Sequence, residues 1–179
     1  MKTWSIDPSH TSLDFAIRHM GISTVRGRFK KLGGTIETSD NETLKSIEVT
    51  IDPVSIDTGD SKRDEHLRSA DFFDVERYPE IVFRSTRVEP RGNGRYAIGG
   101  ELSIHGQTRR AAFEVETASP VNDPWGNLRA AASGNGKLNR KDWGLTWNQA
   151  LEFGALLVGE DVKFTLEVEA VAAVPVAAR

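Results

Sequence analysis

The sequence predicts an all-β fold built from about eight antiparallel strands. Apolar and polar residues alternate strictly in three stretches, residues 13–18, 47–52 and 162–170. Alternation with a period of two is typical of strands that bury one face and expose the other. Turn-forming residues separate the stretches, and no helical pattern alternates regularly with them. A parallel α/β fold is therefore excluded, and a β-sandwich or a β-barrel remains.

Weaker alternation marks further strands, and short polar segments mark the turns between them. Asn93-Gly94 predicts a two-residue hairpin turn, because Asn and Gly tolerate the positive φ of a type I′ turn. Residues 39–41 and Gly106-Gln107 predict two more turns. The weaker strands are residues 81–88, 96–104, 111–115 and 128–138.

Two segments interrupt the strand pattern. Residues 60–73 predict a helix, in which Ser61 and Asp64 resemble a capping box. Residues 139–159 are irregular and contain two of the four tryptophans. We expect both segments to act as lids over the open end of a barrel.

The composition is that of an ordinary globular domain, which we place at residues 3–172. The chain has 179 residues, of which 38% are apolar and 27% are charged. The net charge of −3 and the lack of basic segments interleaved with aromatic residues argue against a nucleic-acid partner. No apolar run approaches the roughly 20 residues of a membrane-spanning helix. The opening residues lack the apolar core of a signal peptide, so we expect a cytoplasmic protein.

The residue types needed for metal binding or catalysis are present but poorly arranged. Cysteine is absent, and the histidine spacing matches no compact zinc signature. Neither a nucleophile elbow nor a phosphate-binding glycine loop occurs. We therefore expect no metal site and no enzymatic activity. The four histidines are His10, His19, His66 and His105.

Arg63, Asp64 and His66 place three ionisable side chains within one predicted helical turn. Asp64 and His66 are two residues apart and so point to different sides of a helix, which suits anchoring better than an acid–base pair. Arg140 is expected to tie a loop to carbonyl or carboxylate groups. We interpret Arg63, Asp64, His66 and Arg140 as a structural polar network.

Five phenylalanines occupy the inward positions of the alternating strands. Alternation alone does not distinguish a packed interior from a cavity, and an eight-stranded barrel has a size at which either occurs. The five are Phe15, Phe29, Phe83, Phe113 and Phe164.

Longer motifs in this sequence resemble those of the YceI-like family of lipid-binding proteins. The match runs in the family's order from about residue 4 to residue 171, and its most specific part is the block at residues 63–83. The motifs are WSID at 4–7, SHTSLDF at 9–15, VRGRF at 25–29, SIDT at 55–58, RDEHLRSADFFD at 63–74, YPEIVF at 78–83, GELSIHG at 100–106 and LNRKDWGL at 138–145.

The resemblance implies an extended antiparallel eight-stranded lipocalin-like barrel with a short helical insert, assembled as a homodimer. It also implies an apolar tunnel that binds a polyisoprenoid, an isoprenoid quinone or a fatty lipid, with no cofactor apart from such a ligand. His19 or Arg63 would supply selectivity at the mouth. The predicted ligand-binding residues are Phe15, Ile17, His19, Phe29, Ile47, Val49, Phe83, Leu102, Ile104, Phe113, Trp147, Val162, Phe164 and Leu166.

Two other classes of function stay open beside the carriage, storage or sequestration of a lipid. One is an enzyme that uses the barrel as an apolar substrate pocket, and the other is a filled barrel that serves protein–protein contacts. Many members of the family carry a signal peptide, and the opening residues here do not resemble one. A periplasmic role is therefore not carried over from the resemblance.

Overall fold

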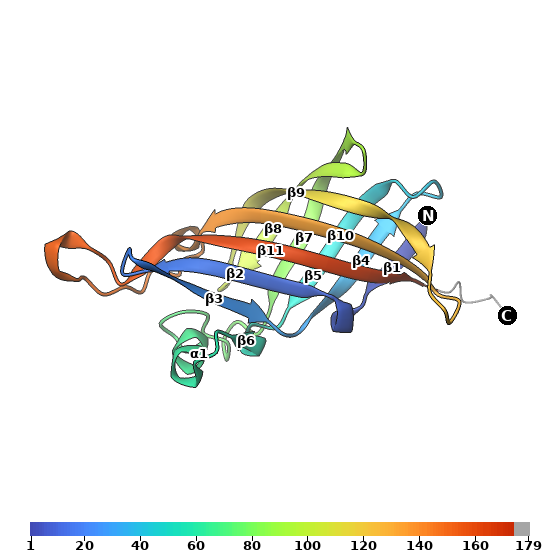
Figure 1. Ribbon diagram of the computed structural model, residues 1–179. Helices are drawn as coiled ribbons and strands as arrows, with labels where there is room; N and C mark the ends of the chain where they lie inside the picture. The colour runs from blue at the N-terminus through green and yellow to red at the C-terminus, as the bar shows by residue number, and fades with distance from the viewer. Residues whose placement is uncertain (174–179) are drawn as a thin grey trace.

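The computed structural model describes residues 1–173 and shows a closed antiparallel barrel of eight strands with one short helix (Figure 1). Each strand of the ring pairs with its two neighbours, and the last strand closes the ring by pairing with the first. The predicted all-β barrel is thus confirmed, and the sandwich alternative is excluded. In order around the ring, the strands are β1 (Lys2–Ile6), β4 (Leu32–Thr38), β5 (Leu44–Ile51), β7 (Ile81–Gly92), β8 (Arg95–Ile104), β9 (Gln107–Asn122), β10 (Leu128–Asn139) and β11 (Val158–Ala172).

Three further strands lengthen the barrel at one end. β2 (Ser12–His19) pairs with the first part of β11, β3 (Ser23–Phe29) pairs with β2, and β6 (Ile56–Asp57) pairs with the end of β3. The last residues of β11 pair instead with β1. β1 and β2 are therefore two parts of one long, bent strand that follows β11.

Asp-Pro pairs produce the bends in these long strands. Pro8 opens a single 3₁₀ turn between β1 and β2, and Pro53 opens another between β5 and β6. Proline has no N–H for a strand ladder, but it is well tolerated at the first position of a helical turn. The carboxylates of Asp7 and Asp52 each accept the backbone N–H two residues further on, which caps the turn. The chain thus changes direction at each turn and continues as the next strand of the same barrel wall.

The helical insert covers the wall between β6 and β7. In the described part of the chain β6 pairs with β3 alone, so this stretch of wall has no continuous ladder. The helix α1 (Ser61–Arg68) lies against it, and Arg68 donates hydrogen bonds to the carbonyl oxygens of Val54 and Ile56. Leu67 and Phe73 pack against the hydrophobic core. The insert therefore closes the barrel with side chains instead of backbone pairing.

The helix differs from the predicted one at both ends. Asp60, rather than Ser61, is the N-cap, because its carboxylate accepts two backbone N–H groups of the first turn. Asp64 turns to the N–H and hydroxyl of Thr58, so the predicted capping box does not form. The helix ends at Arg68, five residues earlier than predicted, since the next residue has an extended backbone.

The predicted turns are present with one shift. Asn93-Gly94 joins β7 to β8 with φ values of 53° and 74°, as a type I′ turn requires. Residues 39–43 join β4 to β5. The third turn lies at His105-Gly106, one residue earlier than predicted, because Gln107 already pairs with Ile104 in the ladder.

The irregular segment 139–159 forms a long loop between β10 and β11. It begins with the 3₁₀ turn Arg140–Trp143 and continues to a narrow tip that is closed by a bridge between Ala150 and Leu156. Figure 1 shows it in orange-red, projecting from one end of the barrel beside the tip of the β2–β3 hairpin. The helical insert lies toward the same end.

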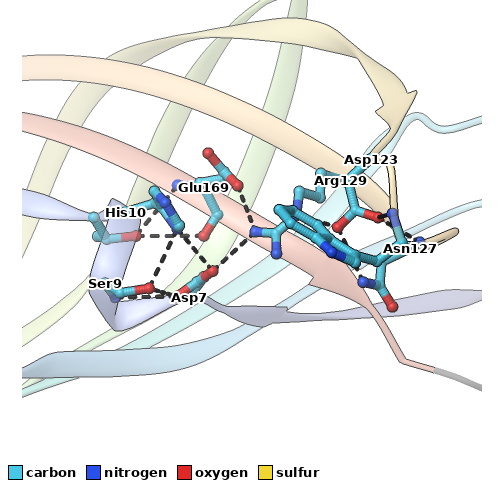
Figure 2. A network of polar contacts seen from close by, with 9 residues as sticks. Asp7, Ser9, His10, Asp123, Asn127, Arg129 and Glu169 are labelled. Atoms are coloured by element: carbon cyan, nitrogen blue, oxygen red, sulfur yellow. Dashed lines mark hydrogen bonds and ion pairs between the residues drawn. The ribbon is translucent and has the colours of Figure 1, made fainter.

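Arg129 joins three segments at the opposite end of the barrel (Figure 2). Its Nε donates to Asp123 in the β9–β10 loop at 2.8 Å, and its Nη1 donates to Asp7 at 2.9 Å and to Glu169 on β11 at 2.5 Å. Asp7 directly follows β1, so the guanidinium connects the strands that close the ring. This group of charges supports the closure that the short β1–β11 ladder makes.

The same group contains a possible set of metal ligands. Ligand atoms of Asp7, His10 and Glu169 lie within 4.8 Å of one another. Both carboxylates, however, already accept hydrogen bonds from Arg129, and Nδ1 of His10 lies 3.0 Å from Asp7. Arg129 thus supplies the positive charge beside these carboxylates.

We expect Arg129→Met to lower the melting temperature at pH 7 by several degrees. The melting temperature of the variant should also fall less than that of the wild type as the pH is lowered from 7 to 2. Hydrogen bonds from Ser9 and Arg129 hold the pKa of Asp7 well below its usual range, and Arg129 does the same to the pKa of Asp123. A carboxyl whose pKa is depressed by folding stabilises the fold above its unfolded pKa of about 3.9, and this stabilisation disappears as the pH falls. Thermal melts between pH 7 and pH 2 measure the effect.

The matched control is Arg91→Met, which removes an exposed arginine whose ion pair among residues 1–173 is with Glu89 at the protein surface. Its melting temperature should follow that of the wild type across the whole range, because exposed ion pairs contribute little. If Arg129→Met instead parallels the wild-type pH profile, Arg129 does not stabilise the closure.

Candidate functional site

A cavity of about 650 Å³ runs inside the barrel. Its wall includes Trp4 and Ile6 of β1, and it continues to Arg63 and His66 of α1 and Trp147 of the long loop. The volume lies within the range of small-molecule pockets. Aliphatic and aromatic side chains form most of the wall. The interior is therefore hollow and apolar, which the alternation of the sequence had left undecided.

All fourteen residues predicted to bind a ligand line this cavity. Thirteen of them lie on strands, where the period-two alternation turns them inward, and His19 is the last residue of β2. Trp147 is on the long loop. Their role in binding stays a prediction. They are Phe15, Ile17, His19, Phe29, Ile47, Val49, Phe83, Leu102, Ile104, Phe113, Trp147, Val162, Phe164 and Leu166.

Several of these inward side chains are only half-buried, although they point away from the outer surface. Along β11, Val162, Phe164 and Leu166 are half-buried, and the residues between them are exposed. In a solid core such side chains would be in contact on every side. Their remaining accessible surface therefore faces the cavity and is available to an apolar molecule.

Glycines on neighbouring strands make room for the phenylalanine rings. Gly27 lies opposite Phe15 and Gly136 lies opposite Phe164 in the ladders. A Cβ built on either glycine would lie 2.5 Å from the Cζ atom of its phenylalanine. The rings therefore lie against the backbone of the next strand, which keeps them close to the wall and leaves the middle of the barrel open.

The sequence analysis missed the part that these glycines play in shaping the cavity wall. Gly136 belongs to a Gly-Asn-Gly segment inside an otherwise alternating strand, and Gly27 also interrupts a strand. A glycine within a strand is a signal of close approach by another group. The partner could not be named without the strand register.

The rings form two groups along the cavity. Phe83, Phe113 and Phe164 lie in one chain, with ring centroids 5.1 and 5.9 Å apart. Phe15, Phe29 and Phe73 form the other, with spacings of 5.7 and 5.8 Å. Tilted and edge-on contacts at these distances are favourable beyond simple burial. The second group joins the strands to the helical insert, and Phe73 was not among the predicted lining residues.

The two irregular segments meet at the mouth of the cavity. The ring of Trp147 lies 4.7 Å from that of His66 and 5.3 Å from that of Phe72. His66 also lies 5.1 Å from Phe72, and its Nε2 lies 2.8 Å from the carboxylate of Asp71. The segments that we expected to act as lids thus contact each other through aromatic rings.

The predicted polar network is three separate sets of contacts. Arg63 and Asp64 both hydrogen-bond Thr58, so they fasten the start of α1 to the strand before it. His66 instead faces Asp71, and the separation predicted for Asp64 and His66 is present.

Arg140 forms the third set, on the long loop. Its guanidinium is buried and donates to the carbonyl oxygens of Gly159 at 2.7 Å and Leu145 at 2.6 Å. Burial lowers the pKa of this arginine from its ordinary value. The side chain fixes the path of the loop, and Trp143 assists by donating its indole N–H to the carbonyl oxygen of Leu102.

The sequence profile of the YceI-like domain matches residues 4–170. The chain belongs to the YceI-like family. The UPF0312 protein of Staphylococcus aureus strain N315 is 35% identical over 172 residues, which cover 94% of this chain and 97% of that protein. The UPF0312 protein of Serratia proteamaculans is 36% identical over 165 residues, covering 92% and 82%.

Solved structures share the fold. BcnA of Burkholderia cenocepacia aligns with a TM-score of 0.79 at 20% identity, over 92% of this chain and 98% of that one. The YCEI protein of Campylobacter jejuni aligns with a TM-score of 0.74 at 28% identity, over 86% and 88%. A polyisoprenoid-binding domain from Saccharophagus degradans aligns with a TM-score of 0.68 at 17% identity, over 95% and 98%. Among residues 1–173, no helix has both the length and the hydropathy of a membrane-spanning helix.

We expect Gly136→Val to shrink the cavity and weaken the binding of a hydrophobic fluorescent probe about tenfold, the effect of losing roughly two methylene contacts. The new side chain would occupy the place of the Phe164 ring, which must then swing into the cavity. Probe titration measures the loss, and circular dichroism checks the fold.

Gly33→Val is the matched control. It adds the same side chain to a strand glycine that has no atom within 4 Å of the new Cβ position. Equal losses in both variants would mean that the pairing of Gly136 with Phe164 does not shape the cavity.

Proposed function

We propose that this protein binds a long apolar molecule inside the barrel and carries, stores or sequesters it. The observation that carries the proposal is the apolar cavity itself, whose wall runs from β1 to the two inserts and includes half-buried side chains on β11. The family supports apolar ligand binding in general. A polyisoprenoid, an isoprenoid quinone or another fatty lipid is the ligand class that fits this shape.

The energetics favour a chain-like ligand. Burying a methylene group contributes about 0.8 kcal/mol, so a fifteen-carbon chain gains about 12 kcal/mol. This is comparable to the estimated 4–15 kcal/mol that association costs. Affinity therefore grows with the length of chain buried, whereas one methylene more or less changes it only slightly. The named polyisoprenoid-binding domain of Saccharophagus degradans, which shares the fold, supports a branched hydrocarbon chain as the ligand.

Polar groups at the mouth would contact the ligand's head group. His19 and Arg63 both line the cavity, and the tip of the β2–β3 hairpin begins directly after His19. Arg63 keeps its Nε and Nη2 on Thr58, so its remaining donors are those that could reach a ligand oxygen. We infer that the head group lies toward this end and that the hydrocarbon extends toward Trp4.

Binding without catalysis is part of the proposal. The acid–base candidates Asp64 and His66 have separate partners, Thr58 and Asp71. A nucleophile activated by a neighbouring base is not seen among the described residues that line the cavity. The homodimer and the cytoplasmic location expected from the sequence analysis stay predictions.

Mass spectrometry of an organic extract of the purified protein tests the proposal directly. We expect an isoprenoid or fatty compound in an amount approaching one molecule per chain. A clean extract, together with failure to bind added isoprenoid quinone or fatty lipid, would contradict lipid binding.

We expect Phe164→Asp to lose most of the bound lipid while the barrel still folds. The ring contacts Phe113 and Gly136 on the cavity wall, so an ionised carboxylate there would be unpaired in apolar surroundings. Such a group raises its pKa or recruits water, and the cavity gives water a place to enter. Bound lipid and circular dichroism are measured on the same sample.

Thr165→Asp, the control, adds the same charge to the next residue of β11, whose side chain is exposed. This variant should keep its lipid. A folded Phe164→Asp protein with a full lipid load would show that this face of β11 is not the binding site.

A further inference from the structure

Two hairpin tips at the mouth of the barrel carry exposed apolar side chains. Ile22, between β2 and β3, is 78% exposed, and Phe153, in the long loop, is 103% exposed. Met20 and Leu156 beside them are 39% and 44% exposed. We refer to residues 20–22 and 151–156 together as the mouth tips. Bulky apolar groups displayed together in this way mark surfaces that meet an apolar partner.

The two mouth tips are joined at their bases. The backbone N–H of Met20 donates to the carbonyl oxygen of Leu157 at 2.8 Å, and His19 pairs with Val158 in the ladder between β2 and β11. Figure 1 shows both tips at the same end of the barrel, where they extend beyond the ring of strands. The two tips are therefore neighbouring protrusions at one end of the barrel, and the long loop extends further than the hairpin.

The segments that carry the tips are poor in charge. Residues 143–159 contain one charged residue, Glu152, and residues 19–25 contain no Asp, Glu, Lys or Arg, in a chain that is 27% charged. Exposed loops of water-soluble proteins usually carry more charge than this. Low charge reduces the cost of moving these tips from water into an apolar phase.

Backbone conformation holds two of these side chains outward. Met20 has a φ of 53° and Phe153 has a φ of 58°, a region that is unfavourable for bulky residues. Burial does not compensate for the unfavourable backbone conformation of Phe153, because its side chain is fully exposed. Such outliers are typical of functional segments.

The surface continues into the cavity. His19 and Leu157, which adjoin the two tips, both line the cavity wall, whereas Met20, Ile22, Phe153 and Leu156 do not. A ligand that leaves the cavity past the tips therefore passes directly from the apolar cavity wall to the apolar side chains of the tips. This continuity links the tips to the ligand that we propose for the interior.

We propose that the mouth tips dock the barrel on a lipid bilayer, with Ile22 and Phe153 inserted among the acyl chains, so that the ligand passes between membrane and cavity without crossing water. This inference rests on the proposed function. A bilayer fits better than a second protein because the tips are separate protrusions, whereas a stable protein interface buries about 800 Å² on each partner. Arg18 is exposed and donates to the carbonyl oxygen of Gly21 in the β2–β3 tip, and its guanidinium would meet lipid phosphates at the bilayer surface.

Co-sedimentation with phosphatidylcholine vesicles tests the proposal. We expect the wild-type protein to sediment with the vesicles and the double variant Ile22→Ser/Phe153→Ser to bind them at least about tenfold more weakly, as the loss of two inserted apolar side chains requires. The matched control is Val121→Ser/Trp125→Ser, which removes apolar residues that are 63% and 80% exposed at the end of β9 and in the β9–β10 loop, where Asp123 binds Arg129. This control should bind like the wild type.

A second measurement does not depend on removing the anchors. The chain has no cysteine, so a thiol-reactive fluorophore reacts only with a cysteine that is introduced by mutation. An environment-sensitive fluorophore on Ala155→Cys should report an apolar environment when vesicles are added, and the same fluorophore on Pro124→Cys should not. A response at residue 124 instead of residue 155 would overturn the assignment.

The outcomes separate this proposal from the proposed function. Absence of vesicle binding by a wild-type protein whose extract contains lipid overturns docking and leaves lipid binding intact. Vesicle binding by a protein that neither contains nor binds lipid would leave docking intact and overturn the function. The double variant should retain its lipid, because neither residue lines the cavity. If light scattering shows that it has lost a dimer partner, the tips are an interface between two copies, and the proposal is wrong.

Discussion

The pairing of strand β11 determines how the barrel closes and what its interior contains. β11 pairs with β10 over most of its length, with β2 through its first part and with β1 through its last residues. This register fixes which side chains point inward, since shifting a strand by one residue would turn every inward side chain outward. Val162, Phe164 and Leu166 face the cavity for this reason. Closure and the chemistry of the wall are thus set by the same ladder.

A hollow core requires the wall to be stable without the packing that a filled core supplies. Missing contacts across a cavity cost stability, and small voids are already unfavourable. The barrel offsets this in its wall: Phe15 and Phe164 lie against glycine backbones on the next strand, and ring contacts link one strand to another. The cavity is therefore a built feature of the register and of the glycine positions. A ligand that filled it would restore the missing contacts and stabilise the fold.

The sequence predicts the features that depend on local patterns. Alternation identifies the inward faces, and Asn93-Gly94 identifies its hairpin, because side-chain direction and turn geometry are decided by a few neighbouring residues. Barrel closure is not local, since β1 meets β11 more than 160 residues later in the chain, and only the family resemblance favoured it over a sandwich. The contact of Trp147 with His66 and the contacts of Arg129 with Asp7 and Glu169 likewise depend on the finished fold. The N-cap of the helix was predicted wrongly for a different reason. Asp60 and Ser61 are both good N-cap residues, and Asp64 cannot complete a capping box with Ser61 because it binds Thr58.

The two ends of the barrel have opposite chemistry, and this difference gives the cavity a direction. At the β1 end, Arg129 and three carboxylates join the β9–β10 loop to the strands that close the ring. Opening that end would separate a guanidinium from its partners and expose the short β1–β11 ladder. At the other end, the wall between β6 and β7 has side-chain contacts in place of a ladder, and ring contacts with His66 and Phe72 join Trp147 to the helical insert. Dispersion contacts between rings are weaker individually and less demanding in geometry than charge-assisted hydrogen bonds. Under the proposed function, a ligand therefore enters and leaves past the helical insert and the long loop, while the ionic end stays closed.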